Sequence, residues 1–366
     1  MSGRLFVFAG GGTGGHLAPG LAVAAELRRR EPDCRIRFVG SGRPIEQQML
    51  GSTGYEVVAH DVQPLSLLRR RPIRMLRSHW RAYQSERTGM RRDRPAAVIG
   101  LGGYASFPTA MAAKKEGVPV LLLEQNAIAG RATRLLARWF PVCVTFEASR
   151  RSFGRSAKVH VTGNPLRPEF AGLMPVDRDQ ASSPPTLLVL GGSQGSQQVN
   201  DAVLGAAETL ATGAMSGWRV IHQTGPDDAA RVQDTYERLE IEHRVAGFFP
   251  KMAELYAAAD LCVARAGATS LTELAASGVP SILIPYPFAA DNHQAANAMA
   301  FEAAGAAVVF DPRDHFGETF QIRHDMELLL SDAAKRSEMR KSMASISRPN
   351  AASDVVQVLA QLVTTS

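Results

Sequence analysis

The chain has 366 residues, enough for two or three domains of about 100 to 200 residues, each with its own core. Hydrophobic residues make up 45% and charged residues 21%, which excludes a disordered chain, and no apolar run reaches the roughly 18 residues that span a bilayer. The formal charge of +6, from 41 basic and 35 acidic residues, indicates an anionic partner.

The beginning of the chain predicts a cytosolic protein, and its cysteines predict free thiols. The apolar run of residues 5–9 is too short for the core of a signal peptide, and no cluster of positive charge precedes it. Cys34, Cys143 and Cys262 each stand alone in or beside a strand-like run, with no His or Cys at the spacing of metal ligands. We therefore expect three buried free thiols.

Short β-branched runs alternate with longer amphipathic stretches, a pattern typical of βαβ units around a parallel sheet. The predicted fold class is therefore α/β. In the first half, strands are expected at residues 5–9, 36–39, 56–59, 97–101, 118–123, 142–146 and 159–162. In the second half, strands are expected at residues 186–190, 219–223, 244–248, 261–264, 279–284 and 307–310.

Prolines between residues 165 and 185 separate the two halves, and a segment of this composition favours an extended linker. The pattern of strand, glycine turn and helix then starts again. We expect one domain over residues 1–164 and a second over residues 165–345. The last segment, residues 346–366, is helical in pattern and could pack on either half, including a return to the first domain.

The first glycine-rich turn, residues 10–16 with the sequence GGGTGGH, joins a strand to a helix. Backbone N–H groups of such a turn, together with the helix N-terminus, suit a phosphate. Gly10, Gly12 and Gly15 also satisfy the dinucleotide fingerprint G-x-G-x-x-G, but no acid follows the second strand, so only Arg43 could support an NADP enzyme. A tight turn without a ligand is the remaining alternative.

Two further glycine turns follow strands. Residues 191–196, GGSQGS, repeat the arrangement in the second half, so two facing domains would enclose a cleft with an anion site on each wall. Residues 102–108, GGYASFP, form a third turn. An ordinary connection between a strand and a helix is an equally good interpretation of it.

Two polar clusters in the second half allow a functional and a structural interpretation. Ser270 and Glu273 have the spacing of a capping box, but Glu273 could instead accept both hydroxyls of a ribose. Asp291, His293 and Gln294 lie with Asn297 after a proline-rich break, where they suit either the hydroxyls of a sugar or the start of a helix.

A basic stretch covers residues 65–94, where ten arginines face only Glu86 and Asp93. Arginines interleaved with apolar residues are typical of a segment that binds an anionic membrane surface. A solvated surface is the alternative, and nucleic acid is not expected, because no array of stacking aromatic residues is present. The candidate membrane residues are Leu68, Arg69, Arg70, Arg71, Ile73, Arg74, Leu76 and Trp80.

Seven motifs together resemble the MurG family, whose members are UDP-N-acetylglucosamine transferases that complete lipid II for bacterial peptidoglycan. In chain order they are GGTGGH, GGYASFP, EQN at 124–126, GNPLR at 163–167, GGSQG, RAGATSLTELAASGVP and DNHQAANA. The similarity runs from about residue 5 to residue 360. It implies a GT-B fold of two Rossmann-like domains facing a cleft, and a peripheral enzyme at the cytoplasmic face of the plasma membrane.

The resemblance also implies roles for individual residues. The uracil would meet the backbone at Phe249, the ribose Glu273, and the diphosphate Ser193. Asn126 and Gln294 would hold the sugar. The full set of implied donor contacts is Thr13, Gly14, Gly15, Asn126, Arg167, Ser193, Phe249, Ala268, Thr269, Ser270, Leu271, Thr272, Glu273 and Gln294.

For the acceptor, the resemblance implies transfer to the muramyl 4-OH of lipid I, whose diphosphate would meet His16, Gly103 and Tyr104. His16 is also the candidate general base, although it could simply line the acceptor phosphate. No cofactor and no metal are expected, because Asp177 and Asp179 lie in the linker and not at a strand end. The rival functions are a UDP-N-acetylglucosamine 2-epimerase and a non-catalytic UDP-sugar sensor.

Overall fold

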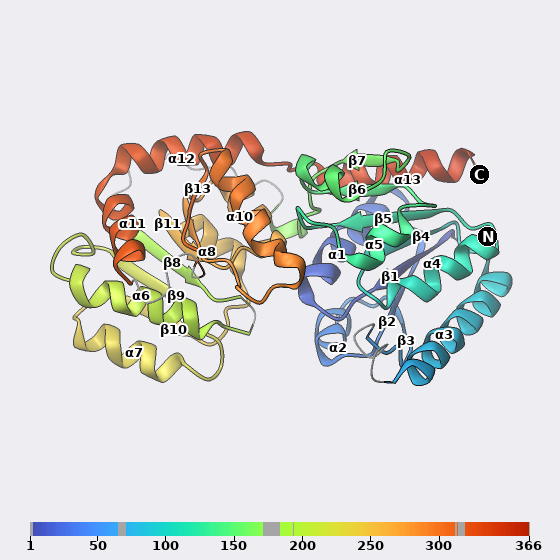
Figure 1. Cartoon of the computed structure of the whole chain (residues 1–366), viewed down its shortest axis with the longest axis horizontal. Coiled ribbons are helices and arrows are strands. Elements are labelled where there is room, and N and C mark those ends of the chain that lie inside the picture. The colour runs from blue at the N-terminus through green and yellow to red at the C-terminus, as the bar shows by residue number, and fades with distance from the viewer. Residues whose placement is uncertain are drawn as a thin grey trace. The chain divides into compact units, whose positions relative to one another are not determined.

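The computed structural model describes residues 3–64, 71–170, 184–192, 194–311, 313 and 319–365. These residues form two compact units: the blue-to-green part of the chain in Figure 1 belongs to the first, together with the red helix α13, and most of the yellow-to-orange part belongs to the second. The first unit comprises Met1–Pro168 together with Arg348–Ser366, and the second comprises Glu169–Ser347. Each unit has its own parallel sheet and its own core, as expected for the α/β class.

Within the described part of the first unit, seven parallel strands form one sheet in the order β3-β2-β1-β4-β5-β6-β7. The strands are β1 (Leu5–Gly10), β2 (Arg35–Gly40), β3 (Glu56–Ala59), β4 (Ala97–Gly102), β5 (Val120–Glu124), β6 (Val142–Val144) and β7 (Val159–Val161). All six residues of β1 are buried, because helices cover both faces of a parallel sheet. The strand order reverses between β1 and β4, so the turns that follow these two strands lie side by side.

Among the described residues of the first unit, five α-helices follow strands of the sheet, and a sixth comes from the C-terminal end of the chain. They are α1 (Gly14–Arg30), α2 (Pro44–Leu50), α3 (Pro72–Asp93), α4 (Ser106–Lys115), α5 (Arg131–Leu136) and α13 (Ala351–Thr365). The C-terminal helix α13 packs against α1 (Figure 1). Its buried side chains Val355, Val356 and Leu359 join the same core as Phe6 and Phe8 of β1. The last helix therefore completes the core of the first unit.

Within the described part of the second unit, six parallel strands follow the order β10-β9-β8-β11-β12-β13. The strands are β8 (Thr186–Leu190), β9 (Arg219–Gln223), β10 (His243–Ala246), β11 (Leu261–Ala264), β12 (Ser281–Leu283) and β13 (Ala307–Val309). The helices are α6 (Gln197–Leu210), α7 (Ala229–Arg238), α8 (Met252–Ala258), α9 (Ala268–Ser277), α10 (His293–Ala303), α11 (Thr319–Ser331) and α12 (Ala333–Ile346). The order reverses between β8 and β11, which places the turns after these strands together.

The expectations for secondary structure and cysteines are confirmed. All thirteen expected strands form, and the bounds of those at 56–59, 186–190, 219–223 and 261–264 agree at both ends. Cys34, Cys143 and Cys262 are free and buried, and burial raises the pKa of the Cys143 thiol to about 12. Among the described helices, none combines the length and the apolar character that crossing a bilayer requires.

Candidate functional site

In the first unit, the first glycine turn brings Thr13 and His16 together. Thr13 is the N-cap of α1, and its Oγ1 lies 2.9 Å from Nδ1 of His16. Gly14 and Gly15 are the first two residues of α1 and lie between Thr13 and His16 in the sequence. The His16 ring also lies close to the third glycine turn, because a Cβ at Gly102 would be 3.3 Å from Nε2 of His16. The turns after β1 and β4 therefore form one cluster.

Gly103 and Tyr104 belong to this cluster. Gly103 has a φ of 72°, which favours glycine, and its backbone faces the His16 ring. The guanidinium of Arg43 lies over the Tyr104 ring at 5.8 Å from its centre, and donates to the Gly12 carbonyl at 3.2 Å. The three residues with an implied acceptor role, His16, Gly103 and Tyr104, are thus neighbours in the structure.

Asn126 lies in the turn after β5, and a buried carboxylate fixes that turn. Glu124 accepts hydrogen bonds from the N–H groups of Asn126 at 3.1 Å and Gly130 at 2.9 Å, and from the Asn126 side chain at 3.3 Å. The hydroxyl of Thr133, in the helix that follows, lies near both Gly102 and Gly130. Asn126 therefore belongs to the same edge of the sheet as the His16 cluster. Arg167 follows β7 and is half-buried at the end of the first unit.

In the second unit, the turns after β8 and β11 line a cavity of about 750 Å³. The N-termini of two helices open into it. Ser196 caps α6 by accepting from the Val199 N–H at 3.3 Å, and Gly267 is the N-cap of α9. The cavity is lined by Gly191, Gly192, Gly195, Ser196, Gln197, Gln198, Arg265, Gly267, Ser270, Tyr286, Pro287, Phe288, Gln294 and Arg313. Two helix N-termini with a guanidinium make an environment that favours anions.

Arg265 supplies that guanidinium. It donates to the carbonyls of Ile284 at 3.1 Å and Pro285 at 3.0 Å and to the Gln198 side chain at 2.9 Å, and it lies over the Tyr286 ring. Within the described part of the chain, no carboxylate forms an ion pair with it. Burial lowers the pKa of the Arg265 guanidinium to about 10, so it remains charged near neutral pH. An unneutralised cation therefore faces the cavity.

The alternative of a capping box at Ser270 and Glu273 is wrong. The helix α9 begins at Ala268, so its N-cap is Gly267, and Ser270 is already the third helical residue. Ser270 lines the cavity, whereas Glu273 lies one turn further along α9 and is 5% exposed. In the same stretch, the Thr272 hydroxyl donates to the Ala268 carbonyl at 2.7 Å. Ala268 and Leu271 are buried, and Thr269 lies between them.

Gln223 ties the second glycine turn to Phe249. Its side-chain amide donates to the Gly192 carbonyl, and its carbonyl accepts from the Phe249 N–H, both at 3.0 Å. Phe249 is buried. Gln294 lines the cavity and accepts from the Tyr286 N–H at 2.9 Å, while Asn297 is fully buried and donates to the Ala266 carbonyl. The polar cluster after residue 290 thus contributes Gln294 to the cavity, whereas Asn297 supports the turn behind it.

Residues 72–93 of the basic stretch form the long helix α3, whose two halves differ. In the C-terminal half, Arg87 and Arg91 pair with Glu116 at 2.5 and 2.9 Å. The acids of this half also have partners: Glu86 lies 2.6 Å from His60, and Asp93 lies 2.8 Å from Arg37. The C-terminal half is therefore held to the rest of the unit by ion pairs.

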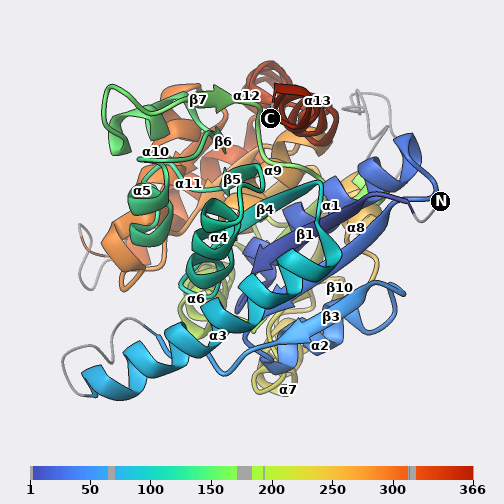
Figure 2. The ribbon, with the colours of Figure 1, turned by 90° about the vertical axis from the view of Figure 1, so that its right-hand side faces the viewer.

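The N-terminal half of α3 presents exposed apolar side chains. Ile73 is 72% exposed, Leu76 58% and Trp80 61%, and exposed arginines at 71 and 74 lie among them. Figure 2 shows this end of α3 extending beyond α4. Large apolar side chains that cluster on a surface indicate an interaction site.

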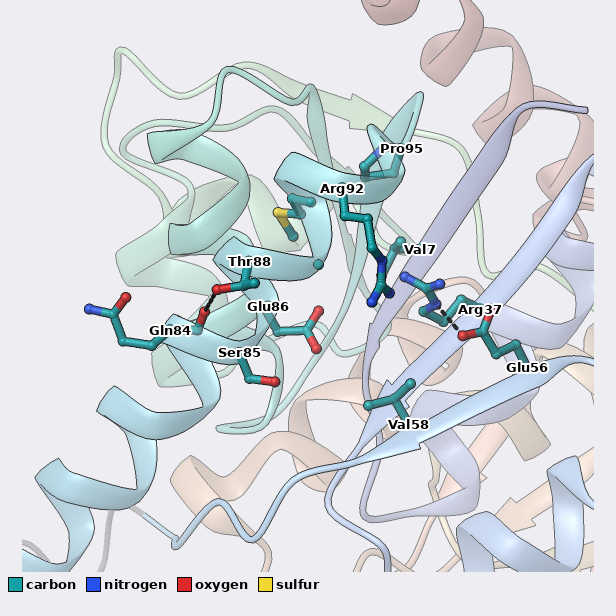
Figure 3. A pocket seen from close by; sticks show the side chains of 12 residues that line it. Val7, Arg37, Glu56, Val58, Gln84, Ser85, Glu86, Thr88, Arg92 and Pro95 are labelled. Carbon is teal, nitrogen blue, oxygen red and sulfur yellow. Dashed lines mark hydrogen bonds and ion pairs between the residues drawn. The ribbon is translucent and has the colours of Figure 1, made fainter. Parts of the chain in front are cut away.

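A second cavity, of about 460 Å³, lies in the first unit beneath α3 (Figure 3). Ser85 and Gly89 of α3 line the cavity on the helix side. Val58 and Arg37 line it on the sheet side. The cavity has charged walls, but Arg37 pairs there with Glu56 at 2.8 Å, so the charges are compensated within the protein. No candidate residue from the sequence lies in this cavity.

Some candidates fall outside the described residues, namely Ser193, Leu68, Arg69, Arg70, Asp177 and Asp179. The sequence analysis also missed functional candidates that the structure identifies. Arg265 follows a strand directly, and a cation at that point, two residues before Gly267, was a usable signal. Gln223 and Glu46 gave no such signal, because Gln223 binds Gly192 and Phe249, and Glu46 binds Gly12 34 positions earlier.

Comparisons with known proteins identify relatives of this chain. The family models of the glycosyltransferase family 28 N-terminal and C-terminal domains match residues 6–142 and 186–357. A UDP-N-acetylglucosamine--N-acetylmuramyl-(pentapeptide) pyrophosphoryl-undecaprenol N-acetylglucosamine transferase of Syntrophotalea carbinolica is 41% identical, with 86% of this chain and 87% of the relative covered. A protein of the same name from Anaeromyxobacter sp. (strain Fw109-5) is 38% identical, with 98% and 93% covered.

Among solved structures, MurG of Acinetobacter baumannii has a TM-score of 0.79 and 29% identity, with 98% of this chain and 99% of the other covered. A UDP-GlcNAc 2-epimerase of Neisseria meningitidis has a TM-score of 0.66 at 15% identity, with 98% and 99% covered, which shows a shared fold alone. Because family models match both halves and relatives of high coverage carry one name, the chain belongs to glycosyltransferase family 28 and, within it, to the MurG family.

Proposed function

We propose that the chain transfers N-acetylglucosamine from UDP-N-acetylglucosamine to the muramyl 4-OH of lipid I, which gives lipid II. The observation that carries this proposal is the cavity of the second unit, where two helix N-termini and the unneutralised Arg265 favour a diphosphate. The names of the relatives supply the sugar and the acceptor. The reaction is an inverting hexosyl transfer in peptidoglycan synthesis.

On the donor side, we assign the diphosphate to the turn of residues 191–196 and to the start of α9. Glu273 is the proposed ligand of the ribose hydroxyls, and Gln294 is a proposed ligand of the sugar. Phe249 is the proposed backbone contact of the uracil. Its N–H already donates to Gln223, so its carbonyl is the group that remains to accept from the uracil N3–H. Thr13, Gly14, Gly15, Asn126 and Arg167 complete the proposed donor set.

The chemistry of the transfer follows from charge. As the bond between the anomeric carbon and the diphosphate breaks, negative charge grows on the β-phosphate. Preorganised N–H groups and the guanidinium of Arg265 stabilise that charge because they are aimed before the reaction starts. On the acceptor side, His16 is the proposed base that takes the proton of the 4-OH. Gly103 and Tyr104 are its proposed partners for the acceptor diphosphate.

We further propose that the N-terminal half of α3 binds the anionic cytoplasmic face of the plasma membrane, where the lipid acceptor resides. Ile73, Leu76 and Trp80 would insert shallowly, and the arginines around them would meet lipid phosphates. The described residues of the N-terminal half make no ion pair with Glu116, unlike Arg87 and Arg91 of the C-terminal half. The enzyme would then be peripheral.

One experiment separates this function from its two rivals. The full chain is incubated with UDP-N-acetylglucosamine, with and without a soluble lipid I analogue, and UDP and N-acetylmannosamine are measured. Release of UDP that depends on the acceptor supports the transferase. N-acetylmannosamine formed without acceptor would establish the epimerase, and binding of the nucleotide without any turnover would establish the sensor.

A further inference from the structure

A buried carboxylate fills the first glycine turn. Glu46, on α2, is 3% exposed and accepts from the Gly12 N–H through Oε1 at 2.7 Å. The same carboxylate accepts from the Ser41 hydroxyl at 2.8 Å and from the N–H groups of Ser41 at 2.9 Å and Gly42 at 2.7 Å. Two turns that are about thirty residues apart in the sequence are therefore joined by one side chain.

The glycines of this region leave room for the Glu46 carboxylate, because a side chain at their positions would meet it. A Cβ at Gly11, whose φ is 158°, would stand 2.5 Å from Oε1 of Glu46, and a Cβ at Gly40 would also collide with the carboxylate. In dinucleotide-binding folds, the corresponding turn gives its N–H groups to a pyrophosphate, and an acid after the second strand binds the ribose. Here the acid lies further along, on α2, and points back into the turn. It takes the Gly12 N–H that a dinucleotide would need.

The turn held by Glu46 leads directly to the proposed base. Gly12 is followed by Thr13, whose side chain is hydrogen-bonded to His16. On the outer side of the turn, the Gly12 carbonyl accepts from Arg43, which follows the same β2 strand as Glu46. Gly12 is thus fixed by its N–H on one side and by its carbonyl on the other.

We propose that Glu46 is a positioning residue for the transferase reaction: it acts as an internal anion that fixes the turn of residues 10–13 and so sets the place of His16. This inference rests on the function proposed above. Glu46 touches neither substrate in this role. It also makes the first turn unfit for a dinucleotide, because its carboxylate occupies the position at Gly12 that a phosphate would take.

The test is Glu46→Gln in the full chain. Glutamine has the size of glutamate, but only one oxygen. Oε1 accepts from the Gly12 N–H, the Ser41 hydroxyl and, at 3.2 Å, the Ser41 N–H, whereas Oε2 accepts from the Ser41 and Gly42 N–H groups. Either orientation of the amide therefore sets its NH₂ group against two backbone N–H groups, which cannot accept from it. Glu86→Gln is the matched control, since Glu86 is a buried acid of the same unit that pairs with His60.

With a soluble lipid I analogue, we expect kcat of Glu46→Gln to fall about 10- to 100-fold, while KM for UDP-N-acetylglucosamine changes by less than about twofold. Hydrogen exchange of residues 10–16 should become faster in Glu46→Gln and stay unchanged in Glu86→Gln. If Glu46→Gln does not fold, Glu46→Asp, which keeps the charge but withdraws it by one methylene, is measured in the same way.

A wild-type kcat in the Glu46 variant would overturn the proposal. An equal fall of kcat in both variants at equal loss of thermal stability would also overturn it, because the effect would then be general destabilisation. The exchange experiment needs no substrate. A protein without transferase activity whose turn is still protected by Glu46 would therefore refute the proposed function and leave the role of Glu46 in the turn intact.

Discussion

The Thr13 hydroxyl and the His16 imidazole are hydrogen-bonded to each other, with Oγ1 and Nδ1 2.9 Å apart. This bond determines what His16 can do. A base needs a free lone pair on Nε2, and in the neutral ring that requires the proton on Nδ1, with Thr13 Oγ1 as its acceptor. If Thr13 instead donates to Nδ1, the proton lies on Nε2 and the ring cannot take one from a substrate there.

The first prediction concerns this pair. Thr13→Val keeps the shape of the side chain but removes the acceptor for Nδ1–H, so we expect kcat to fall about tenfold. His16→Ala should lower kcat more, by about 100-fold or more, with the affinity for UDP retained. Steady-state rates with a soluble acceptor and calorimetric titration with UDP provide the two measurements. An unchanged rate in His16→Ala would remove His16 from the mechanism.

The second prediction concerns Glu273. Its position beyond the cap of α9 means that Glu273→Ala loses no cap, so the lost interactions are those with a ligand and with buried neighbours. If Glu273 binds the ribose hydroxyls, the affinity for UDP should fall about 10- to 100-fold, because hydrogen bonds to a charged group contribute about 1.5–3 kcal/mol. Glu273→Gln keeps the size of the side chain but removes its charge, so it should show most of the loss in UDP affinity. Unaltered affinity for UDP, alongside a lowered melting temperature, would make Glu273 purely structural.

The third prediction concerns Arg265. Replacement by Lys keeps the charge, but a single ammonium cannot reproduce the fork that contacts Ile284, Pro285 and Gln198. We expect Arg265→Lys to weaken UDP binding about tenfold and to weaken uridine binding very little, since uridine carries no phosphate. Comparable losses for uridine and UDP would show that Arg265 shapes the cavity and does not serve the diphosphate.

Most of the fold could be predicted because its signals are local. A strand of a parallel sheet is buried on both faces, so it appears in the sequence as a short and mostly apolar run between turn residues, as at 186–190 and 261–264. The glycine turns are local signals of the same kind, since each needs residues without a side chain at fixed places. Gly195, for example, lies with its φ at 77° directly against the backbone of Thr224.

The site was less predictable, because its supporting side chains depend on contacts that are distant in the sequence. Glu46 lies in a stretch that reads as an ordinary amphipathic helix, yet it binds Gly12, 34 positions earlier. Gln223 joins Gly192 to Phe249 from the end of a third segment. Ser270 and Glu273 show the converse error: the spacing of a capping box was present, but the helix begins three residues earlier, at Gly267 and Ala268.

The fourth prediction tests the membrane surface on α3. Replacing Leu76 and Trp80 together by Ser should cut binding to vesicles that contain anionic lipid, because both side chains are exposed there and would lose their insertion. Arg71→Gln with Arg74→Gln should weaken binding mainly at low salt. Leu328→Ser, on α11 of the second unit, is the control, because Leu328 is also an exposed apolar side chain on a helix, at 45% exposure. Turnover of a soluble acceptor should be retained in all three variants, and undiminished vesicle binding would place the membrane contact elsewhere.

The fifth prediction concerns a buried histidine that the reaction does not use. His222 is fully buried between Tyr236 and Asn200, with Nδ1 2.9 Å from the tyrosine hydroxyl and Nε2 3.0 Å from the Asn200 carbonyl oxygen. The Asn200 amide donates to the Thr224 carbonyl and to Asp228, which leaves its oxygen as the acceptor of Nε2–H. Nδ1 then accepts from Tyr236. The ring is therefore neutral in the folded protein.

Burial lowers the pKa of His222 from 6.5 to about 3, and this makes the free energy of unfolding depend on pH. Below pH 6.5 the His222 ring binds a proton in the unfolded chain, whereas in the folded chain it stays neutral down to about pH 3. The contribution of the neutral ring to the free energy of unfolding is therefore complete above pH 6.5 and declines as the pH falls. Between about pH 7 and pH 5 the decline amounts to about 2 kcal/mol. Asparagine at this position cannot bind the proton. The difference in the free energy of unfolding between the native chain and the less stable His222→Asn should therefore shrink by that amount over the same range. Urea unfolding at the two pH values measures it, and a deficit that stays constant would mean that His222 is protonated in the folded state or that the second unit opens at acid pH.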